Sequence, residues 1–243
     1  MKAIILVAGY ATRLYPLTLN LPKALLPIGG KPILETIIEH VGAVSAIDGI
    51  YAVSNHKFAG HFEKWAETSP IPVKVLDDGT TSEENRRGAI GDIAFVMEQE
   101  NLDDDTVIIA GDNYFTFSLQ NYYQYFLDKN SDCVCVRQIA DREELKQLGV
   151  AVLDADGRLL RMVEKPADPP SDYAVFATYM YKKETMQMIH AYLREGNKPD
   201  APGNFVQWLC QRKPVYAFHM DGDCFDIGTP AAYEEVQQWV KKA

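Results

Sequence analysis

The sequence has few of the residues from which disulfide frameworks and structural metal sites are built. Four of its 243 residues are cysteine, and no two of them form a C-x-x-C pair. Cys133 and Cys135 lie two apart in a predicted strand, which places both on one face. The five histidines show no spacing typical of metal ligands. We therefore expect reduced core cysteines, structural histidines and no structural zinc site.

Long hydrophobic runs are also missing. No apolar run approaches the roughly 20 residues that a membrane-spanning helix needs. The run Ala3–Ala8 is too short for a signal peptide and lacks a cleavage pattern. These absences predict a cytoplasmic protein that does not act at a membrane.

Positive charge is scarce. The chain has 24 lysines and arginines against 34 aspartates and glutamates, a formal net charge of -10. An acidic surface argues against general nucleic-acid binding, because phosphate backbones need neutralising by basic side chains. The 47% hydrophobic content is ordinary for a globular chain of this length and predicts a core that forms without disulfide bonds or structural metals.

Short apolar runs alternate with helical periodicity over roughly the first 115 residues. We expect strands at 4–7, 50–53, 73–75 and 107–110. We expect helices at 33–41, 57–67 and 90–97, and a loop at 77–87. This alternation predicts a mainly parallel sheet with helices on its faces.

The pattern changes in the second half, where strand signals follow one another more closely. Runs at 150–153 and 159–163 flank Asp156-Gly157, a good hairpin signal. Further strands are expected at 133–139, 173–181 and 215–218, and helices at 118–127, 185–193, 205–210 and 231–240. Nothing marks a firm domain boundary, so we expect one mixed α/β unit.

A segment rich in turn residues follows the first strand directly, from Gly9 to Thr18 and on to Pro22-Lys23-Ala24. Open parallel sheets place ligands at the carboxyl ends of their strands. Arg13 and Lys23 would add two fixed cations suited to a triphosphate. Neither G-x-x-x-x-G-K-[ST] nor G-x-G-x-x-G is present. An anion site is thus one interpretation, and a structural turn with two solvated charges is the other.

Two distant aspartates could share one Mg²⁺ ion. Asp112 follows the strand at 107–110, and Asp226 stands between two apolar neighbours, where a buried carboxylate would need a metal or a cation. Asp112 could instead close a turn through its own backbone. Thr229 should cap the last helix, with Pro230 at its first position.

The fourth segment is Val163-Glu164-Lys165-Pro166. Lys165 could bind the phosphate of a second substrate or be a surface lysine. Glu164 could bind a sugar hydroxyl or orient Lys165. The later segment 199–205 could shape the same pocket, or it could be a turn in which Asn204 caps the next helix.

These segments, in this order, resemble the sugar-1-phosphate nucleotidyltransferase family, which includes glucose-1-phosphate thymidylyltransferases and uridylyltransferases and is related to phosphocholine cytidylyltransferases. The resemblance spans nearly the whole chain. The matching residues are Ala8-Gly9, Thr12-Arg13-Leu14, Pro16, Pro22-Lys23-Ala24, Gly111-Asp112, Glu164-Lys165-Pro166 and Asp226-Ile227-Gly228-Thr229.

The resemblance implies an α/β fold with a Rossmann-like, mainly parallel mixed sheet flanked by helices and an inserted acceptor-binding hairpin region. Residues 1–243 would form one domain, with a nucleotide-binding core at 1–115 and an acceptor-binding region and C-terminal helix at 116–243.

The resemblance also implies roles for matching positions. Arg13 would contact the departing pyrophosphate and Lys23 the triphosphate. Asp112 and Asp226 would hold Mg²⁺. Lys165 would hold the acceptor phosphate, with Glu164 near the sugar and Asn204 in the acceptor pocket. The nucleotide-binding set would be Ala8, Gly9, Tyr10, Ala11, Thr12, Arg13, Lys23, Gly88 and Asp112.

Two departures from the family pattern concern the nucleotide. Ala11 replaces the usual glycine before Thr-Arg, which narrows the backbone geometries open to the loop. The expected Gln-x-Pro-x-Gly segment reads Asn85-Arg86-Arg87-Gly88. The base is therefore not determined by the sequence.

The implied reaction joins a nucleoside triphosphate, with dTTP or UTP favoured, to a sugar 1-phosphate and releases pyrophosphate. A cytidylyltransferase that acts on an alcohol phosphate such as phosphocholine is an alternative, and so is a non-catalytic nucleotide-sugar sensor. A glycosyltransferase would need an Asp-x-Asp motif. Residues 103–105 supply that pattern, but they precede their strand and are expected to be a solvated loop.

Overall fold

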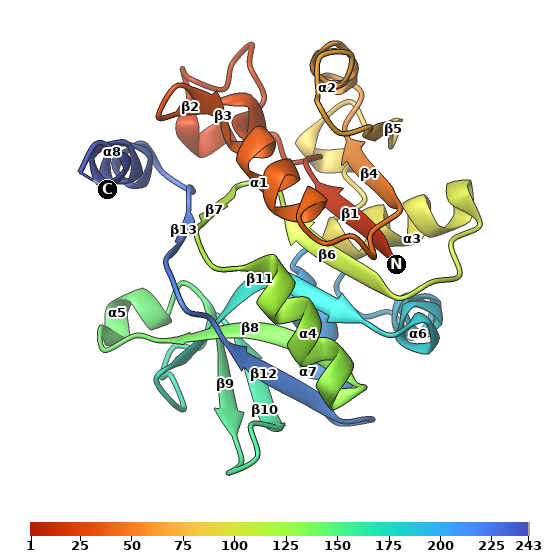
Figure 1. Ribbon diagram of the computed structural model, residues 1–243, viewed down its shortest axis with the longest axis vertical. Helices are drawn as coiled ribbons and strands as arrows, with labels where there is room; N and C mark the ends of the chain where they lie inside the picture. Colours follow the sequence, from red (N-terminus) through yellow and green to blue (C-terminus); the bar gives the residue numbers. More distant parts are fainter. Residues whose placement is uncertain (243) are drawn as a thin grey trace.

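A nine-stranded mixed sheet runs through the computed structural model, which describes residues 1–242 (Figure 1). Its main path is β10-β9-β11-β6-β1-β4-β5, and β8 joins it at β11 with β12 beyond. The strands are β1 (Lys2–Leu6), β4 (Gly49–Ser54), β5 (Lys74–Asp77), β6 (Thr106–Ala110), β8 (Asp132–Gln138), β9 (Gly149–Leu153), β10 (Leu159–Glu164), β11 (Tyr173–Tyr181) and β12 (Val215–His219).

The first half of the chain forms the parallel part of the sheet. β1 pairs in parallel with β4 on one side and β6 on the other, and β4 pairs in parallel with β5. Ile4 and Ile5 are both fully buried, and they belong to separate hydrophobic clusters. Such short runs, apolar on both faces, are what a doubly covered parallel strand requires. The α/β fold with a parallel core is therefore confirmed.

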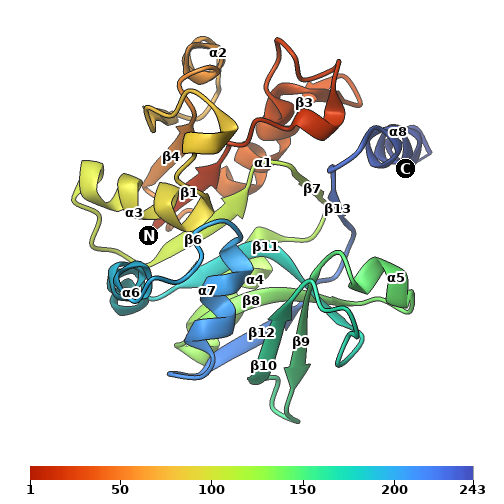
Figure 2. The same ribbon diagram turned by 180° about the vertical axis from the view of Figure 1, so that it is seen from behind.

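Helices cover both faces of the sheet. Ile37 of α1 and Tyr122 of α4 belong to one cluster, and both helices lie on the near face in Figure 1. α3, α6 and α7 contribute to the other cluster and lie in front in Figure 2. The α-helices are α1 (Ile33–Gly42), α2 (Ala59–Ala66), α3 (Ala89–Glu100), α4 (Leu119–Lys129), α5 (Arg142–Leu145), α6 (Lys183–Arg194), α7 (Pro202–Leu209) and α8 (Pro230–Val240).

The second half of the chain extends the same sheet. β11 pairs antiparallel with β6 at its C-terminal end, with β9 at its N-terminal end and with β8 at both ends. β9 and β10 form the predicted hairpin, and β12 runs parallel to β8. Residues after 116 therefore complete the sheet that β1, β4, β5 and β6 begin.

Two short ribbons stand outside the large sheet. β2 (Pro27–Ile28) pairs with β3 (Lys31–Pro32) just before α1, where no strand was expected from the sequence. β7 (Asn113–Phe115) pairs with β13 (Cys224–Asp226) and leads to α8, which lies beside the β2–β3 ribbon (Figure 1). Three single turns of 3-10 helix occur at η1 (Thr12–Leu14), η2 (Lys23–Leu25) and η3 (Glu83–Asn85), the last within the predicted 77–87 loop.

The cysteines are all free and buried, as expected. Burial raises the pKa of each of these thiols, which keeps them protonated and unreactive. Among residues 1–242, no helix has the length and apolar character that crossing a membrane would require.

Candidate active site

The loop after β1 has the tight backbone that an anion-binding turn requires. Ala11 adopts a left-handed conformation with φ 51° and ψ 41°, although it has a Cβ. Its carbonyl oxygen accepts hydrogen bonds from the Leu14 backbone at 3.0 Å and from Thr18 Oγ1 at 2.8 Å. Ala11 therefore takes the left-handed conformation that glycine adopts without cost, and local hydrogen bonds hold it there.

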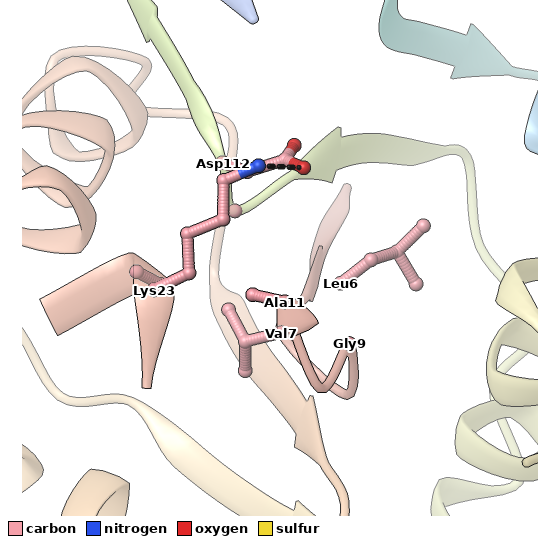
Figure 3. Close-up of a pocket in the computed structure, with 8 residues that line it drawn as sticks. Leu6, Val7, Gly9, Ala11, Lys23 and Asp112 are labelled. Carbon is pink, nitrogen blue, oxygen red and sulfur yellow. Dashed lines mark hydrogen bonds and ion pairs between the residues drawn. The ribbon is translucent and has the colours of Figure 1, made fainter. Parts of the chain in front are cut away.

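A cavity of about 120 Å³ opens at the carboxyl ends of β1 and β6 (Figure 3). It is lined by Leu6, Val7, Gly9, Ala11, Lys23, Ala24, Gly111 and Asp112. A Cβ on Gly111 would lie 2.3 Å from Val7 Cγ1 and 3.0 Å from the Leu6 oxygen, so this position requires glycine. The segments 9–11 and 23–24 and the aspartate at 112 thus meet at one site.

Lys23 connects the two predicted metal carboxylates. Its Nζ lies 2.8 Å from Asp112 Oδ2 and 3.8 Å from Asp226 Oδ1. Figure 3 shows the side chain extending from its short turn to the Asp112 carboxylate. The lysine side chain is 12% exposed, so its charge is largely removed from water and both aspartates stabilise it.

The β7–β13 ribbon brings Asp226 to this site across more than one hundred residues of chain. Asp226 is the register partner of Asn113, and the Ile227 backbone donates to the Asp112 carbonyl oxygen at 3.2 Å. Thr229 Oγ1 accepts from Ala232, and Pro230 opens α8, so the predicted cap is confirmed. The expectation that Asp226 is buried was wrong, because its side chain is 52% exposed at the cleft and has Lys23 as its cationic partner.

Five charged side chains from four separate segments act on one another here. Loss of hydration in the cleft and the Asp112 carboxylate raise the pKa of Asp226. Lys23, Lys165 and Arg13 oppose that rise. All five residues predicted to carry the chemistry are therefore gathered around Asp226.

A second cavity, of about 200 Å³, shares Asp112 with the first and also reaches Asp226. It is lined by Ala110, Asp112, Asn113, Gln147, Leu148, Gly149, Glu164, Lys165, Val175, Phe176, Ala177, Tyr179, Ala201, Pro202, Gly203 and Asp226. Lys165 has φ 47° and donates its backbone N–H to the Leu148 oxygen at 3.0 Å. That strained backbone holds Lys165 at the cavity and is a feature that the sequence did not reveal.

Glu164 faces the part of this cavity formed by α7. Burial raises the pKa of its carboxyl, and Lys165 partly offsets that effect. A Cβ on Gly203 would lie 2.1 Å from Glu164 Oε2, and one on Gly149 would lie 3.1 Å from the same atom. These two glycines leave the carboxyl the space it occupies.

Asn113 is a cavity residue to which the sequence assigned no role. Its side chain is buried, and its Nδ2 has no hydrogen-bond partner among residues 1–242. The neighbouring Asp112 was the signal that could have pointed to it. A larger cavity of about 460 Å³ continues past Lys165 and adds Arg13 and Arg137 to the shared wall.

Two predicted site residues lie elsewhere. Asn204 lines a separate cavity of about 370 Å³ together with Tyr192 and Trp208. It does not cap α7, because the helix begins at Pro202, a favoured first residue, with Ala201 at the N-cap. The prediction of that cap was wrong, and acceptor binding by Asn204 remains a prediction.

Gly88 is required by a close backbone contact. It has φ 76°, and a Cβ would lie 2.7 Å from the Pro199 oxygen. The Ala89 and Ile90 backbones donate to the oxygens of Asp200 and Pro199. Packing against the segment before α7 explains this glycine, and contact with a base remains a prediction.

The aspartates at 103–105 lie at the other end of the sheet. The Asp105 oxygen accepts from the Lys2 backbone at the start of β1, and its carboxylate pairs with Lys182 at 2.8 Å. They are therefore far along β1 and β6 from the carboxyl ends where the cavities open, as expected of residues that precede their strand. Among residues 1–242, no three His, Cys, Asp or Glu side chains form a ready metal cluster.

Comparison with known proteins shows the family to which the chain belongs. A profile described as nucleotidyl transferase matches residues 2–243. The chain belongs to the nucleotidyl transferase family. It is 31% identical to a proposed mannose-1-phosphate guanyltransferase of Sulfolobus acidocaldarius, over 97% of this chain and 62% of that protein. It is 24% identical to the UTP–glucose-1-phosphate uridylyltransferase AglF of Haloferax volcanii, over 98% of this chain and 96% of that one.

Family members differ in length, and this chain spans 62% and 52% of two of the relatives it matches, the second a bifunctional GlmU protein of Methanocaldococcus jannaschii. The fold is shared with a UDP-glucose pyrophosphorylase solved with UDP-glucose, at a TM-score of 0.82 and 21% identity, over 100% of this chain and 99% of the other. The apo form gives a TM-score of 0.83 at 20% identity, over 99% and 98%.

Proposed function

We propose that this nucleotidyl transferase joins the nucleotidyl group of a nucleoside triphosphate to a sugar 1-phosphate and releases pyrophosphate. The observation that carries the proposal is the position of Lys23, Asp112 and Asp226. They stand between a cavity beside the β1 loop and a second cavity that contains Lys165 and Glu164. The first would take the triphosphate and the second the sugar phosphate.

The reaction would be an in-line displacement at the α-phosphorus. An oxygen of the acceptor phosphate forms the new P–O bond, and the bond to the bridging oxygen of the β-phosphate breaks. A phosphate monoester is already anionic at neutral pH, so the mechanism needs no strong general base. This agrees with a site of lysines, an arginine and carboxylates.

The main task of the protein would be to hold two polyanions that repel each other. Arg13 and Lys23 would neutralise the triphosphate and then the leaving pyrophosphate, and Lys165 would bind the acceptor phosphate. Glu164, with its raised pKa, would bind a sugar hydroxyl at the α7 side. Of these groups, Lys23 is already held beside both aspartates before substrate arrives.

The two carboxylates fit a magnesium ion. Mg²⁺ binds proteins through one or two carboxylates together with substrate phosphates, and loss of hydration followed by the charge of Asp112 raises the pKa of Asp226. We infer that Asp112 and Asp226 would hold Mg²⁺. When bound, the ion would supply positive charge to the phosphates at the reacting centre.

We favour UTP or dTTP as the triphosphate. The support is that the relative matched over 96% of its length is named a uridylyltransferase, and that a structure of the same fold was solved with UDP-glucose. A cytidylyltransferase acting on an alcohol phosphate would bind the same phosphates. The sensor alternative would bind nucleotide without releasing pyrophosphate.

The deciding experiment measures pyrophosphate release with Mg²⁺ across a matrix of triphosphates and phosphorylated acceptors. We expect release from UTP or dTTP that depends on a hexose 1-phosphate. Release only from CTP with an alcohol phosphate would establish the alternative. Nucleotide binding without release from any pair would contradict the enzyme and favour the sensor.

A further inference from the structure

A pair of buried aspartates lies at the base of the segment between β5 and α3, residues 78–88, which we call the 78–88 loop. Asp78 directly follows β5 and is 2% exposed, and Asp92 lies near the start of α3 and is 5% exposed. Asp78 Oδ2 and Asp92 Oδ1 are buried, and neither has a hydrogen-bond donor among residues 1–242. Buried carboxylate oxygens without a donor are costly, so this pair requires an explanation.

Asp78 cannot turn its free oxygen away. Its Oδ1 accepts from the backbone and the hydroxyl of Thr80, each at 2.7 Å. Its backbone N–H donates to the Ser54 oxygen at 2.8 Å, and its carbonyl oxygen accepts from Arg87 Nε at 2.9 Å. Thr80 satisfies only Oδ1, so the missing donor to Oδ2 should come from Asp92, which contacts Asp78.

A proton on Asp92 satisfies both oxygens at once. Burial, followed by the charge of Asp78 and the hydrogen bond to it, raises the pKa of Asp92 to about 8, with Arg87 opposing that rise. Two carboxyl groups in contact commonly keep one proton between them. Arg87 does not replace that proton, because its Nε is bonded to the Asp78 backbone and its guanidinium lies over the Phe95 ring at 4.7 Å.

We propose that Asp92 donates a shared proton to Asp78, and that this bond positions the 78–88 loop for nucleotide binding. The inference rests on the proposed function. The loop lies at the carboxyl ends of β4 and β5, the edge of the sheet where ligands bind, and it ends at Gly88, for which contact with the base is predicted. Asp92 and Asp78 are positioning residues, since they would act on the nucleotide through the loop.

Other charged or titratable groups also face the pair or its loop, from five parts of the chain. They are Tyr10 after β1, His56 after β4, Asp77 on β5, Glu83, Glu84, Arg86 and Arg87 in the loop, and Asp200 before α7, which pairs with Arg86 at 3.0 Å. Burial raises the pKa of Tyr10, which stays protonated at neutral pH. His56 and Asp77 form a more exposed pair at 2.6 Å, and the hydrogen bond to Asp77 raises the pKa of His56. The His56–Asp77 pair therefore needs a control of its own, separate from the Asp78–Asp92 pair.

The shared proton has a definite pH signature. The pKa of Asp92 is higher in the folded protein than in the unfolded chain, so folding takes up a proton between those two values. The stabilisation from this proton is complete below about pH 4, the pKa of a free aspartate, and is lost as pH rises through about 8. If the loop binds nucleotide only when the proton is present, affinity should fall by about tenfold between pH 7 and pH 9.

The first test uses the free protein. Infrared spectroscopy of the wild type at pH 7 should show the carbonyl band of a protonated carboxylic acid, which disappears as pH rises to 9. Asp92→Asn should lack this band, and the control variant Asp77→Asn should retain it. Absence of the band from the wild type at pH 7 would overturn the inference, and this measurement needs no variant to fold.

The second test measures amide exchange in the 78–88 loop and the affinity for nucleotide. The asparagine of Asp92→Asn donates to Asp78 at every pH, so amides of residues 79–88 should exchange faster in wild type than in the variant at pH 9, and equally at pH 7. The affinity for UTP, dTTP and CTP with Mg²⁺ should fall about tenfold from pH 7 to 9 in wild type and Asp77→Asn, measured as a rise in Kd. It should stay nearly constant in Asp92→Asn.

Equal exchange at pH 9 in wild type and Asp92→Asn would overturn the positioning role, and so would the same affinity loss in both proteins. If no triphosphate binds to wild type at any pH, the proposed function fails. The infrared band and the exchange of the free protein would then still decide whether the shared proton holds the loop.

Discussion

In the free site, the ammonium group of Lys23 interacts with two carboxylates at once. Its ammonium group lies 2.8 Å from Asp112 and 3.8 Å from Asp226, in the place where an ion with two carboxylate ligands would also be expected. On the proposed function, a bound triphosphate would offer the lysine anionic oxygens, and Mg²⁺ would give the aspartates a new cationic partner. The ion pair would therefore hold the site together until the substrates replace it.

We predict that Asp112→Asn and Asp226→Asn each lower turnover at least about 100-fold, the scale of losing one electrostatic stabiliser. The reason is that asparagine keeps the shape but removes a charge that would bind Mg²⁺. The measurement is kcat for pyrophosphate release at saturating substrates. Asp221→Asn, which changes an exposed aspartate in the same segment, is the matched control and should keep wild-type turnover. Near-normal kcat in either site variant would contradict the shared-metal assignment.

Lys165 should matter to one substrate and not to the other. We predict that Lys165→Ala raises KM for the acceptor by about tenfold or more, because a charge-assisted hydrogen bond contributes about 1.5–3 kcal/mol. The Kd for the triphosphate should change little. Lys146→Ala removes a surface lysine paired with Glu143 and serves as the control. Unchanged acceptor kinetics in Lys165→Ala would remove this residue from the site.

At the scale of elements, α7 forms one wall of the second cavity, the proposed acceptor cavity, by packing closely on β10. Gly203 allows this contact, because a Cβ there would lie 2.1 Å from Glu164 Oε2 and 2.9 Å from Met162 Cε. Both atoms are the ends of flexible side chains, so the protein can respond by moving Glu164. A methyl group at 203 should therefore disturb the acceptor site more than the fold.

We predict that Gly203→Ala lowers kcat/KM for the sugar phosphate, by up to on the order of 100-fold if Glu164 moves by about 1 Å. Gly60→Ala is the control, since a Cβ on this α2 residue meets nothing within 4 Å. Thermal unfolding and steady-state kinetics of both variants give the comparison. A Gly203→Ala enzyme with wild-type acceptor kinetics would show that Glu164 does not need its observed position.

Which elements the sequence could predict depends on their length. Strands such as β6 and β11 are apolar runs, and their burial pattern is local and readable. The three-residue strands β7 and β13 show no periodicity, and their pairing joins residues more than one hundred apart. Sequence reasoning could therefore name Asp112 and Asp226 but could not show what brings them together, nor that Asn113 enters the cavity.

At the scale of the whole molecule, the site lies where the two halves of one sheet meet. β6 carries Asp112 at its end, and β11, which pairs with β6, supplies the wall of the acceptor cavity. Asp132 ties further elements of the second half together, because its fully buried carboxylate accepts from Thr185 and Lys213 at 2.8 and 2.9 Å. The strands that border the two cavities therefore belong to one continuous sheet.

A continuous sheet predicts how the molecule unfolds. The pairing of β6 with β11 buries residues from both halves in the same clusters, so the segments before and after residue 116 should lose their structure together. We predict one cooperative transition in urea, with far-ultraviolet circular dichroism and tryptophan fluorescence coinciding. The fluorescence reports on Trp65 in the first segment and on Trp208 and Trp239 in the second.

Single-tryptophan variants sharpen this test. One variant retains only Trp65 and another retains only Trp208. In each variant, the urea midpoint from fluorescence should equal the midpoint from circular dichroism. Separate midpoints for the two probes would show that the nucleotide and acceptor regions unfold as independent units. The site would then lie between two bodies able to move, and closure of those bodies around the substrates would have to enter the mechanism.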